Sequence, residues 1–324
     1  MKKVFVTGVT GFLGRHLLQE MVGSSYEVTA LCRLLPETSA RISGVHYVLG
    51  DIEDSLSLLE VMKGAEVVIH AAALVSMNPS EDHRMYQVNV LGTRNVVNAC
   101  LATNVKRLIH VSSVAALSGS LQNQLIDEKT SWSGSNAGYG YTKYLSELEV
   151  FRGQSEGLEI SIVNPSVILG RGDAQRSSGM IFKFINKGWP ISLEGSANLV
   201  DARDVSNAIV QLMAHQNSGE RYVLNGFSMP WTQLFSEVNN RRGKSIRYYE
   251  VPSPVAFGAL WFFENFLKLF GRSTRLTAHT VRMATSGNRY NSSKIIEDLG
   301  FQFHTPESTL DWACGTDISK AVEK

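Results

Sequence analysis

The sequence predicts an α/β protein with a doubly wound parallel sheet, that is, a sheet covered by helices on both faces. Two observations support this fold class. Strand and helix patterns alternate over the first half of the chain, and a glycine-rich turn joins the first strand directly to the first helix. Repeated strand–helix units form parallel sheets, because each helix carries the chain back to the edge where the previous strand began.

The expected strands are short, mostly apolar runs, and the expected helices lie between them. The strands are residues 3–7, 26–33, 45–49, 66–70, 107–112 and 159–164. The helices are residues 15–22, 55–62, 81–104 and 137–156. Asp54 precedes the second helix and can cap it, and Pro165 closes the sixth strand. Ligands of such sheets bind beyond the carboxyl ends of the strands, so the residues there are the functional candidates.

The turn after the first strand carries glycines at the spacing G-x-x-G-x-x-G. Gly8 lets the chain turn sharply, Gly11 lets the backbone approach phosphates, and Gly14 lets the helix pack close to the strand. A strand, a glycine turn and a helix in this order hold the pyrophosphate of a dinucleotide at the helix N-terminus. We therefore expect a dinucleotide to contact Gly8, Thr10, Gly11, Phe12, Leu13 and Gly14.

The composition is that of an ordinary globular chain. It has 324 residues, of which 44% are hydrophobic and 19% are charged, and its net charge is +1. This near-neutral charge argues against nucleic acid or another polyanion as a partner. Cys32, Cys100 and Cys314 are too widely spaced for a disulfide framework or a zinc site. We therefore expect reduced thiols, no metal and a cytoplasmic protein.

One apolar stretch, residues 255–270, is shorter than a bilayer span and carries Glu264 and Lys268. It predicts an amphipathic helix with Pro254 in its first turn and Gly271 at its end. We expect this helix to pack on the protein's own body. The alternatives are a lid, a subunit contact or an element at a membrane surface, and no integral membrane segment is expected.

The ends of the second, third and fourth strands suggest how a dinucleotide is selected. Arg33 ends the second strand, where an arginine can pair the 2′-phosphate of NADP(H) and Arg41 can assist it. Asp51 can accept a hydrogen bond from the adenine amine while Ile52 packs the ring. The small residues Ala71, Ala72 and Ala73 leave room for a cofactor beside the backbone. The expected cofactor is therefore NADP(H), with NAD(H) as the alternative.

The fifth strand and the helix at residues 137–156 supply the candidate catalytic groups. Tyr139 and Lys143 lie four residues apart and share one helical face. An ammonium beside a phenol would lower the pKa of the phenol from about 10 towards neutrality, which would make Tyr139 a general acid or base. Ser113, at the end of the fifth strand, can bond a substrate oxygen.

Taken together, these motifs make the chain resemble the extended short-chain dehydrogenase/reductases, the NAD(P)-dependent epimerase/dehydratase family. The resemblance rests on residues 7–14, 70–73, 89–93, 112–113, 139–143, 164–167, 290–294 and 299–301, and it spans nearly the whole chain.

The resemblance implies a Rossmann-type fold and a smaller C-terminal substrate-binding part. The expected division is a cofactor domain at residues 1–168 and a substrate part at 169–324, with segments near 200–225 returning to the first. It implies Ser113, Tyr139 and Lys143 as the catalytic set, Lys143 also holding the nicotinamide ribose. It places Pro165, Ser166 and Val167 beside the nicotinamide amide, and assigns Asn89 to a supporting hydrogen-bond network. Members often form homodimers through the two long helices.

Within the family, Arg33 and the segment Leu276-Thr277 look most like the dihydroflavonol-reductase-like and 3β-hydroxysteroid-dehydrogenase-like branch. That branch implies reduction of a carbonyl, or oxidation of the alcohol, in a small apolar or aromatic substrate. The residues Val114-Ala115-Ala116 supply no acid, which argues against a sugar-nucleotide dehydratase.

Two alternatives remain open. One is an NAD-dependent nucleotide-sugar 4-epimerase, and the other is a cofactor-sensing regulator without turnover, which would generally lose the tyrosine or the lysine. Arg171, Arg203 and Arg272 are each interpreted as a substrate anchor or a solvated charge.

Overall fold

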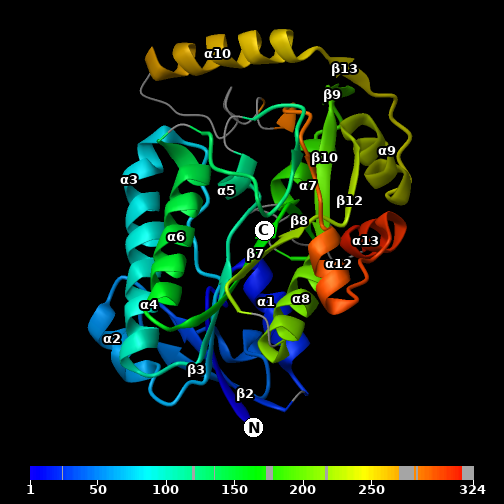
Figure 1. Ribbon diagram of the computed structural model, residues 1–324. Coiled ribbons are helices and arrows are strands. Elements are labelled where there is room, and N and C mark those ends of the chain that lie inside the picture. Colours follow the sequence, from blue (N-terminus) through cyan, green and yellow to red (C-terminus); the bar gives the residue numbers. More distant parts are fainter. Residues whose placement is uncertain are drawn as a thin grey trace.

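Seven parallel strands form the central sheet of the protein (Figure 1). In order across the sheet they are β11 (Glu220–Leu224), β7 (Glu159–Pro165), β5 (Arg107–Val111), β4 (Val67–His70), β1 (Lys2–Thr7), β2 (Tyr26–Cys32) and β3 (Val45–Leu49). The computed structural model describes residues 1–23, 25–118, 121–134, 136–172, 178–215, 218–269, 281 and 284–315. The expected α/β fold with a doubly wound parallel sheet is confirmed.

Helices cover both faces of this sheet. Within β1, the side chains of Val4 and Val6 enter one core and that of Phe5 enters the other, because successive residues of a strand point to opposite faces. The first core is completed by α1 (Phe12–Met21), α8 (Ala202–Ala214) and α12 (Ser293–Leu299). The second is completed by α2 (Ser55–Val61), α4 (Gly92–Ala102) and α6 (Gly138–Ser155).

The strand order reverses between β1 and β4. The chain leaves β1 for β2 on one side, and β4 pairs on the other side of β1. Such a reversal opens a crevice at the carboxyl edge, because the connections after the two neighbouring strands run in opposite directions. The glycine turn after β1 and the alanines after β4 both lie at this crevice.

The long helical segment expected at residues 81–104 contains an irregular stretch. The structure has α3 (Asp82–Met85), a π-helical segment (Tyr86–Leu91) and then α4, preceded by a 3₁₀ turn at Pro79–Glu81. A π-helical turn is rare and often occurs at functional sites. Here it contains Asn89, which is buried. The apolar periodicity alone gave no sign of this wider turn.

The other expected elements lie within two residues of their predicted limits, except that α1 begins at Phe12, three residues before the predicted start. Asp54 caps α2 as expected, since its carboxylate accepts hydrogen bonds from the backbone N–H groups of Leu56 and Ser57, both at 3.1 Å. Short elements of this half that were not expected include the 3₁₀ turn Thr38–Ala40, α5 (Ala115–Ser118) and β6 (Leu125–Ile126).

A third core lies beyond the central sheet. It is built on a three-stranded sheet of β12 (Phe227–Pro230), β10 (Ser196–Asp201) and β8 (Val167–Leu169). The helices α7 (Ser178–Asn186), α9 (Trp231–Arg241) and α13 (Pro306–Ala313) complete it. Two strand pairs flank it, β13 (Tyr249–Val251) with β9 (Ile191–Leu193), and β14 (Arg289–Tyr290) with β6 (Leu125–Ile126).

The C-terminal half also contributes to the central sheet. β11 pairs in parallel with β7, and the helices α8 and α12 pack on the first core. The boundary at residues 168/169 stays a proposal. The substrate part that we propose is therefore joined to the cofactor domain through shared strands and helices.

The apolar helix expected at residues 255–270 is α10 (Ser253–Leu269), which lies along the top of the molecule in Figure 1. We expected it to pack on the protein's body, yet Val255 is 60% and Phe262 is 69% exposed, whereas Ala256 is buried. Side chains beyond residue 262 of this helix, Gly271, Arg272 and the segment Leu276-Thr277 lie outside the described residues. Among the residues that are described, no helix is long and apolar enough to cross a membrane.

Adjacent isoleucines of α12 test whether this C-terminal helix is part of the central core. Ile295 is fully buried, and Ile296 is 46% exposed. We expect Ile295→Ala to lower the free energy of unfolding by about 2–5 kcal/mol, because it leaves a cavity beneath the sheet. Ile296→Ala is the matched control and should change it by less than about 1 kcal/mol. Urea unfolding measures both, and equal effects would contradict the packing of α12 on this core.

Candidate functional site

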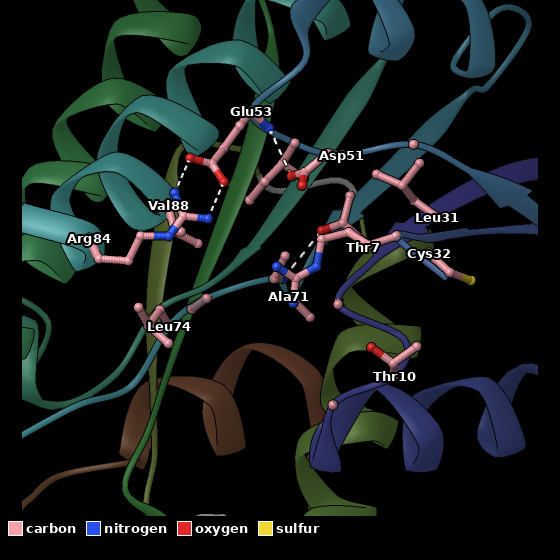
Figure 2. A pocket seen from close by; sticks show the side chains of 17 residues that line it. Thr7, Thr10, Leu31, Cys32, Asp51, Glu53, Ala71, Leu74, Arg84 and Val88 are labelled. Carbon is pink, nitrogen blue, oxygen red and sulfur yellow. Dashed lines mark hydrogen bonds and ion pairs between the residues drawn. The ribbon is translucent and has the colours of Figure 1, made fainter. Parts of the chain in front are cut away.

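A pocket opens at the carboxyl edge of the central sheet, at the crevice between β1 and β4 (Figure 2). The ends of four neighbouring strands, β4, β1, β2 and β3, supply its walls. It is lined by Thr7, Gly8, Thr10, Gly11, Leu31, Cys32, Arg33, Gly50, Asp51, Ile52, Glu53, Ala71, Ala72, Ala73, Leu74, Arg84 and Val88. Nine of the residues expected to bind the cofactor are among them: Gly8, Thr10, Gly11, Arg33, Asp51, Ile52, Ala71, Ala72 and Ala73.

The glycine turn fits a dinucleotide pyrophosphate. Gly8 has a φ of +76°, and a Cβ on it would lie 2.5 Å from the carbonyl carbon of Ala71. A Cβ on Gly14 would lie 2.2 Å from the carbonyl oxygen of Gly8. No side chain caps the N-terminus of α1, which begins after Gly11. Its first backbone N–H groups therefore remain available to an anion, whose charge the helix dipole favours.

Phe12 and Leu13 begin α1 but do not line the pocket. The ring of Phe12 lies edge-on to the ring of His16, with 5.2 Å between the ring centres, and it also lies close to Gly170. The side chain of Leu13 packs against the first core. Only the backbone of these two residues therefore faces the position expected for the pyrophosphate, and their side chains hold α1 in place.

The end of the pocket expected to hold the adenosine contains Arg33, Asp51 and Ile52. Arg33 is exposed, and within the described part of the chain its guanidinium has no hydrogen-bond or ion-pair partner. Asp51 accepts a hydrogen bond from the backbone N–H of Glu53 at 3.1 Å. The side chain of Ile52 is mostly buried, because it packs under Gly92 of α4. Arg41 donates to the carbonyl oxygen of Pro36 instead of lining the pocket.

A salt bridge at the rim of this pocket was not predicted from the sequence. Glu53, four residues after the end of β3, accepts hydrogen bonds from both terminal guanidinium nitrogens of Arg84 at 2.5 Å (Figure 2). Arg84 lies on α3, thirty-one residues further along the chain, so no local spacing could have linked the two side chains. The pair joins α3 to the turn that carries Asp51.

Beneath the pocket, buried hydrogen bonds hold the end of β1 to the end of β4. The hydroxyl of Thr7 accepts from the backbone N–H of Ala72 at 3.2 Å and donates to Nδ1 of His70 at 2.8 Å. His70 donates through Nε2 to the hydroxyl of Thr93 at 3.0 Å, because that hydroxyl gives its own proton to the carbonyl oxygen of Asn89. Burial lowers the pKa of His70 to about 3, so the ring is neutral at physiological pH.

Ser113, Tyr139 and Lys143 meet at the end of β5, where the N-terminus of α6 packs against α5. The side chains of Ser113 and Tyr139 are hydrogen-bonded to each other. Gly140 allows this approach, since a Cβ on it would lie 2.7 Å from the carbonyl oxygen of Ala115. Lys143 is fully buried, and its ammonium donates to the carbonyl oxygen of Val111 at 2.8 Å.

The expected lowering of the Tyr139 pKa is wrong for this structure. Burial raises the pKa of Tyr139 to about 12, and the hydrogen bond with Ser113 only partly opposes the shift. The Lys143 ammonium does not lower it, because that ammonium is bonded to the main chain of β5. At neutral pH, Tyr139 is therefore a phenol that carries its proton.

The pKa of Lys143 is also shifted. Burial lowers it to about 8, while the nearby carboxylate of Glu147 opposes the shift. His110 lies 3.5 Å from the Lys143 nitrogen, and burial holds the pKa of His110 well below its usual value. A neutral imidazole beside the ammonium can accept a hydrogen bond from it but adds no repulsion.

Asn89 joins the two halves of the site, and its expected place in a hydrogen-bond network is confirmed. Its side-chain oxygen accepts from the backbone N–H of Leu74 at 2.7 Å. Its amide nitrogen donates to the carbonyl oxygen of Leu74 at 2.9 Å and to the hydroxyl of Thr142 at 3.0 Å. Thr142 in turn donates to the carbonyl oxygen of Tyr139 at 2.8 Å. The pocket wall and the first turn of α6 are therefore held together.

Residues Pro165, Ser166 and Val167 lie next to the catalytic candidates, at the end of β7. The carbonyl oxygen of Pro165 accepts from the backbone N–H of Val114 at 3.0 Å. Ser166 donates through its backbone to Leu224 at 2.9 Å, and its buried hydroxyl has no partner among the described residues. Val167 begins β8 and is 39% exposed.

The arginines considered as substrate anchors have structural partners. Arg203 pairs with Asp201 at 2.6 Å and lies 4.3 Å from the ring centre of Trp312. Arg171 donates to the carbonyl oxygen of Trp312 at 2.6 Å. Neither is simply a solvated charge. Across the described ranges, no three His, Cys, Asp or Glu side chains are grouped so that they could hold a metal ion.

The close approach of Gly8 to the end of β4 can be tested with a matched glycine. Gly64 has nearly the same φ, +79°, but no atom lies within 4 Å of the position of its Cβ. Gly64→Ala should cost about 1–2 kcal/mol of stability, from backbone strain alone. Gly8→Ala should cost more and abolish NAD(P)H binding, because it also displaces the peptide between Ala71 and Ala72. Thermal unfolding and NAD(P)H fluorescence measure both effects, and equal behaviour of the variants would contradict this geometry.

Comparisons with known proteins agree with this architecture. Residues 4–225 match the NAD dependent epimerase/dehydratase family. A candidate dihydroflavonol 4-reductase of Synechocystis sp. is 29% identical over 95% of this chain and 91% of its own. Sterol demethylase protein B of Methylococcus capsulatus is 28% identical over 94% of each chain.

Solved structures share the fold over the full length. The crystal structure of gox2253 superposes with a TM-score of 0.83 at 27% identity and covers 100% of both chains. The UDP-glucose 4-epimerase of Thermotoga maritima gives a TM-score of 0.79 at 18% identity, over 99% of this chain and 100% of that one, a likeness that shows the fold alone. The chain therefore belongs to the NAD-dependent epimerase/dehydratase family, as an NAD(P)-dependent enzyme of the extended short-chain dehydrogenase/reductase type.

Proposed function

We propose that this enzyme is an NADP(H)-dependent reductase that converts a carbonyl of a small apolar or aromatic substrate into an alcohol. The observation that carries the proposal is the hydrogen bond between Ser113 and Tyr139, at the same sheet edge as the dinucleotide pocket. The phenol of Tyr139 is protonated at neutral pH, and this is the form needed to protonate a carbonyl oxygen.

In the proposed reaction, bound NADPH supplies the hydride that adds to the carbonyl carbon. The hydroxyl of Ser113 holds the carbonyl oxygen, and Tyr139 gives that oxygen its phenolic proton as negative charge develops there. The carbonyl double bond becomes a C–O single bond, and the products are the alcohol and NADP⁺. Lys143 is a buried cation one helical turn from Tyr139, on the same face of α6.

The preference for NADP(H) is supported by Arg33. Its guanidinium is exposed, lines the pocket directly after β2 and has no partner among the described residues. A planar guanidinium can bind the 2′-phosphate of NADP(H) through two hydrogen bonds. An acidic residue at this position would instead favour the ribose hydroxyls of NAD(H).

An apolar substrate is supported by the surroundings of the C-terminal part. Trp189, Trp261 and Phe262 expose large apolar surfaces there. The relative from Methylococcus capsulatus has a name that refers to a sterol. An NAD-dependent nucleotide-sugar 4-epimerase would instead keep its cofactor bound throughout its cycle, and it would show activity with UDP-sugars in place of carbonyl compounds.

The homodimer and the cytoplasmic location also remain proposals. Tyr86 and Leu148 expose 39% and 44% of their surface on the two helical segments through which we propose that the chains pair. Cys32, Cys100 and Cys314 are free thiols, which suits a reducing compartment.

Removal of the Tyr139 hydroxyl tests the reaction. With the best substrate from a panel of ketones and aldehydes, Tyr139→Phe should lower kcat by about 10²–10⁴-fold, because the proton donor is lost. NADPH affinity should be retained. Tyr144→Phe, on the same helix, is the control and should keep its activity, since the ring of Tyr144 would still stack on Trp132 at 5.3 Å. NADPH oxidation at 340 nm reports turnover, and an active Tyr139→Phe enzyme, or activity with UDP-sugars only, would refute the proposal.

Cofactor choice is tested by Arg33→Ala. Loss of hydrogen bonds to a phosphate should weaken NADPH binding by about 10–100-fold and leave NADH binding nearly unchanged. Arg41→Ala is the control, because the Arg41 guanidinium is bonded to the chain at Pro36. Fluorescence titrations give the dissociation constants of the three proteins for each cofactor. Equal affinity of the unmodified enzyme for NADPH and NADH would remove the argument from Arg33.

A further inference from the structure

Lys143 is a buried cation, and most of its neighbours cannot balance its charge. His110 on β5 and His70 on β4 are neutral, since burial lowers the pKa of each, and burial keeps Tyr139 protonated. The carbonyl oxygen of Val111 provides only a dipole. A buried ammonium without an opposite charge tends to lose its proton.

Glu147 supplies the negative charge. It lies four residues after Lys143 on α6, so the two side chains share one face of the helix, and both are buried. Burial raises the pKa of Glu147, whereas the Arg221 guanidinium 2.9 Å away, on β11, favours the carboxylate. The guanidinium of Arg221 also donates to the carbonyl oxygen of Glu128 at 3.4 Å.

The same carboxylate is connected to Ser113. Its Oε1 accepts from Nδ2 of Asn164 on β7 at 2.6 Å. That nitrogen also donates to the carbonyl oxygen of Ser113 at 3.0 Å. Glu147 thus contacts Asn164, which fixes the main chain of Ser113, and its charge also acts on Lys143.

We propose that Glu147 is a positioning residue of the catalytic centre, which keeps the Lys143 ammonium charged and, through Asn164, holds Ser113 in place. The inference rests on the proposed function only in treating Ser113 and Lys143 as catalytic. It gives Arg221 a role as well, because this arginine of the edge strand stabilises the Glu147 carboxylate. The edge strand β11, which carries Arg221, is thereby connected to the active site, although none of its residues lines the pocket.

The direct test is the protonation of Lys143, followed without substrate or cofactor. In protein labelled with ¹³C at the lysine ε-carbon, NMR gives the titration midpoint of Lys143, assigned by the signal lost in Lys143→Arg. The unmodified protein should titrate near pH 8. Glu147→Gln keeps the size of the side chain and a hydrogen-bond acceptor but removes the charge. The titration midpoint of Lys143 should therefore fall by about one to two pH units.

Two further variants separate charge from structure. Glu147→Asp keeps a carboxylate and should restore the midpoint to within about half a unit of the unmodified protein. Glu149 lies on the same helix, and its carboxylate pairs with Arg94 and Arg152. Glu149→Gln removes that carboxylate and should leave the titration midpoint of Lys143 unchanged. If Glu147→Gln does not fold because Arg221 is left unpaired, the double variant Glu147→Gln/Arg221→Gln removes both charges and should show the same fall.

Turnover provides a second readout. The alkaline limb of the pH profile of kcat/KM should move to lower pH in Glu147→Gln by the same amount as the NMR midpoint. An unchanged Lys143 midpoint in Glu147→Gln would overturn the inference, even if activity fell, because a merely structural role does not move that midpoint. If the enzyme turns over none of the carbonyl compounds, the proposed function is refuted. The NMR titration would still decide the role of Glu147.

Discussion

The close packing of the Gly8 turn against the peptide between Ala71 and Ala72 is the constraint on which the rest of the site depends. A Cβ at position 8 would lie 2.5 Å from that peptide, so only glycine allows β1 and β4 to end side by side in this way. The contact brings the N-terminus of α1 to the crevice where the strand order reverses. The pocket follows from it, because its walls are the backbones that this approach brings together.

From this contact a chain of buried hydrogen bonds runs to α6, the helix that carries the proposed proton donor. It passes through a neutral histidine, a π-helical turn and the first turn of α6, along Thr7, His70, Thr93, Asn89, Thr142 and Tyr139. Buried polar groups are costly unless they are paired, so this network specifies one arrangement of the elements that it joins. The dinucleotide turn and the proposed proton donor are therefore parts of one rigid unit.

Much of this could be predicted from the sequence, because the signals are local. The strand runs, the glycine spacing and the four-residue step from Tyr139 to Lys143 lie within single elements or at their junctions. The residues that were missed act across the fold. Arg84 meets Glu53 only after α3 packs beside the loop that follows β3, and Arg221 meets Glu147 only because β11 returns to the sheet beside β7.

The protonation state of Tyr139 could not be predicted from spacing either. The four-residue spacing places Lys143 on the same face of α6 as Tyr139. The direction in which its ammonium points, however, depends on the carbonyl group of Val111, which lies on β5. Burial, a property of the whole packing, then raises the pKa of the phenol.

The central claim is that the Gly8 turn and the Ser113–Tyr139 pair serve one bound nucleotide. A crystal structure of the protein with NADP⁺ tests it most directly. The account predicts the pyrophosphate at the N-terminus of α1, the 2′-phosphate at Arg33 and the hydroxyl of Tyr139 facing the nicotinamide. A nucleotide bound elsewhere, or a nicotinamide directed away from Tyr139, would contradict it.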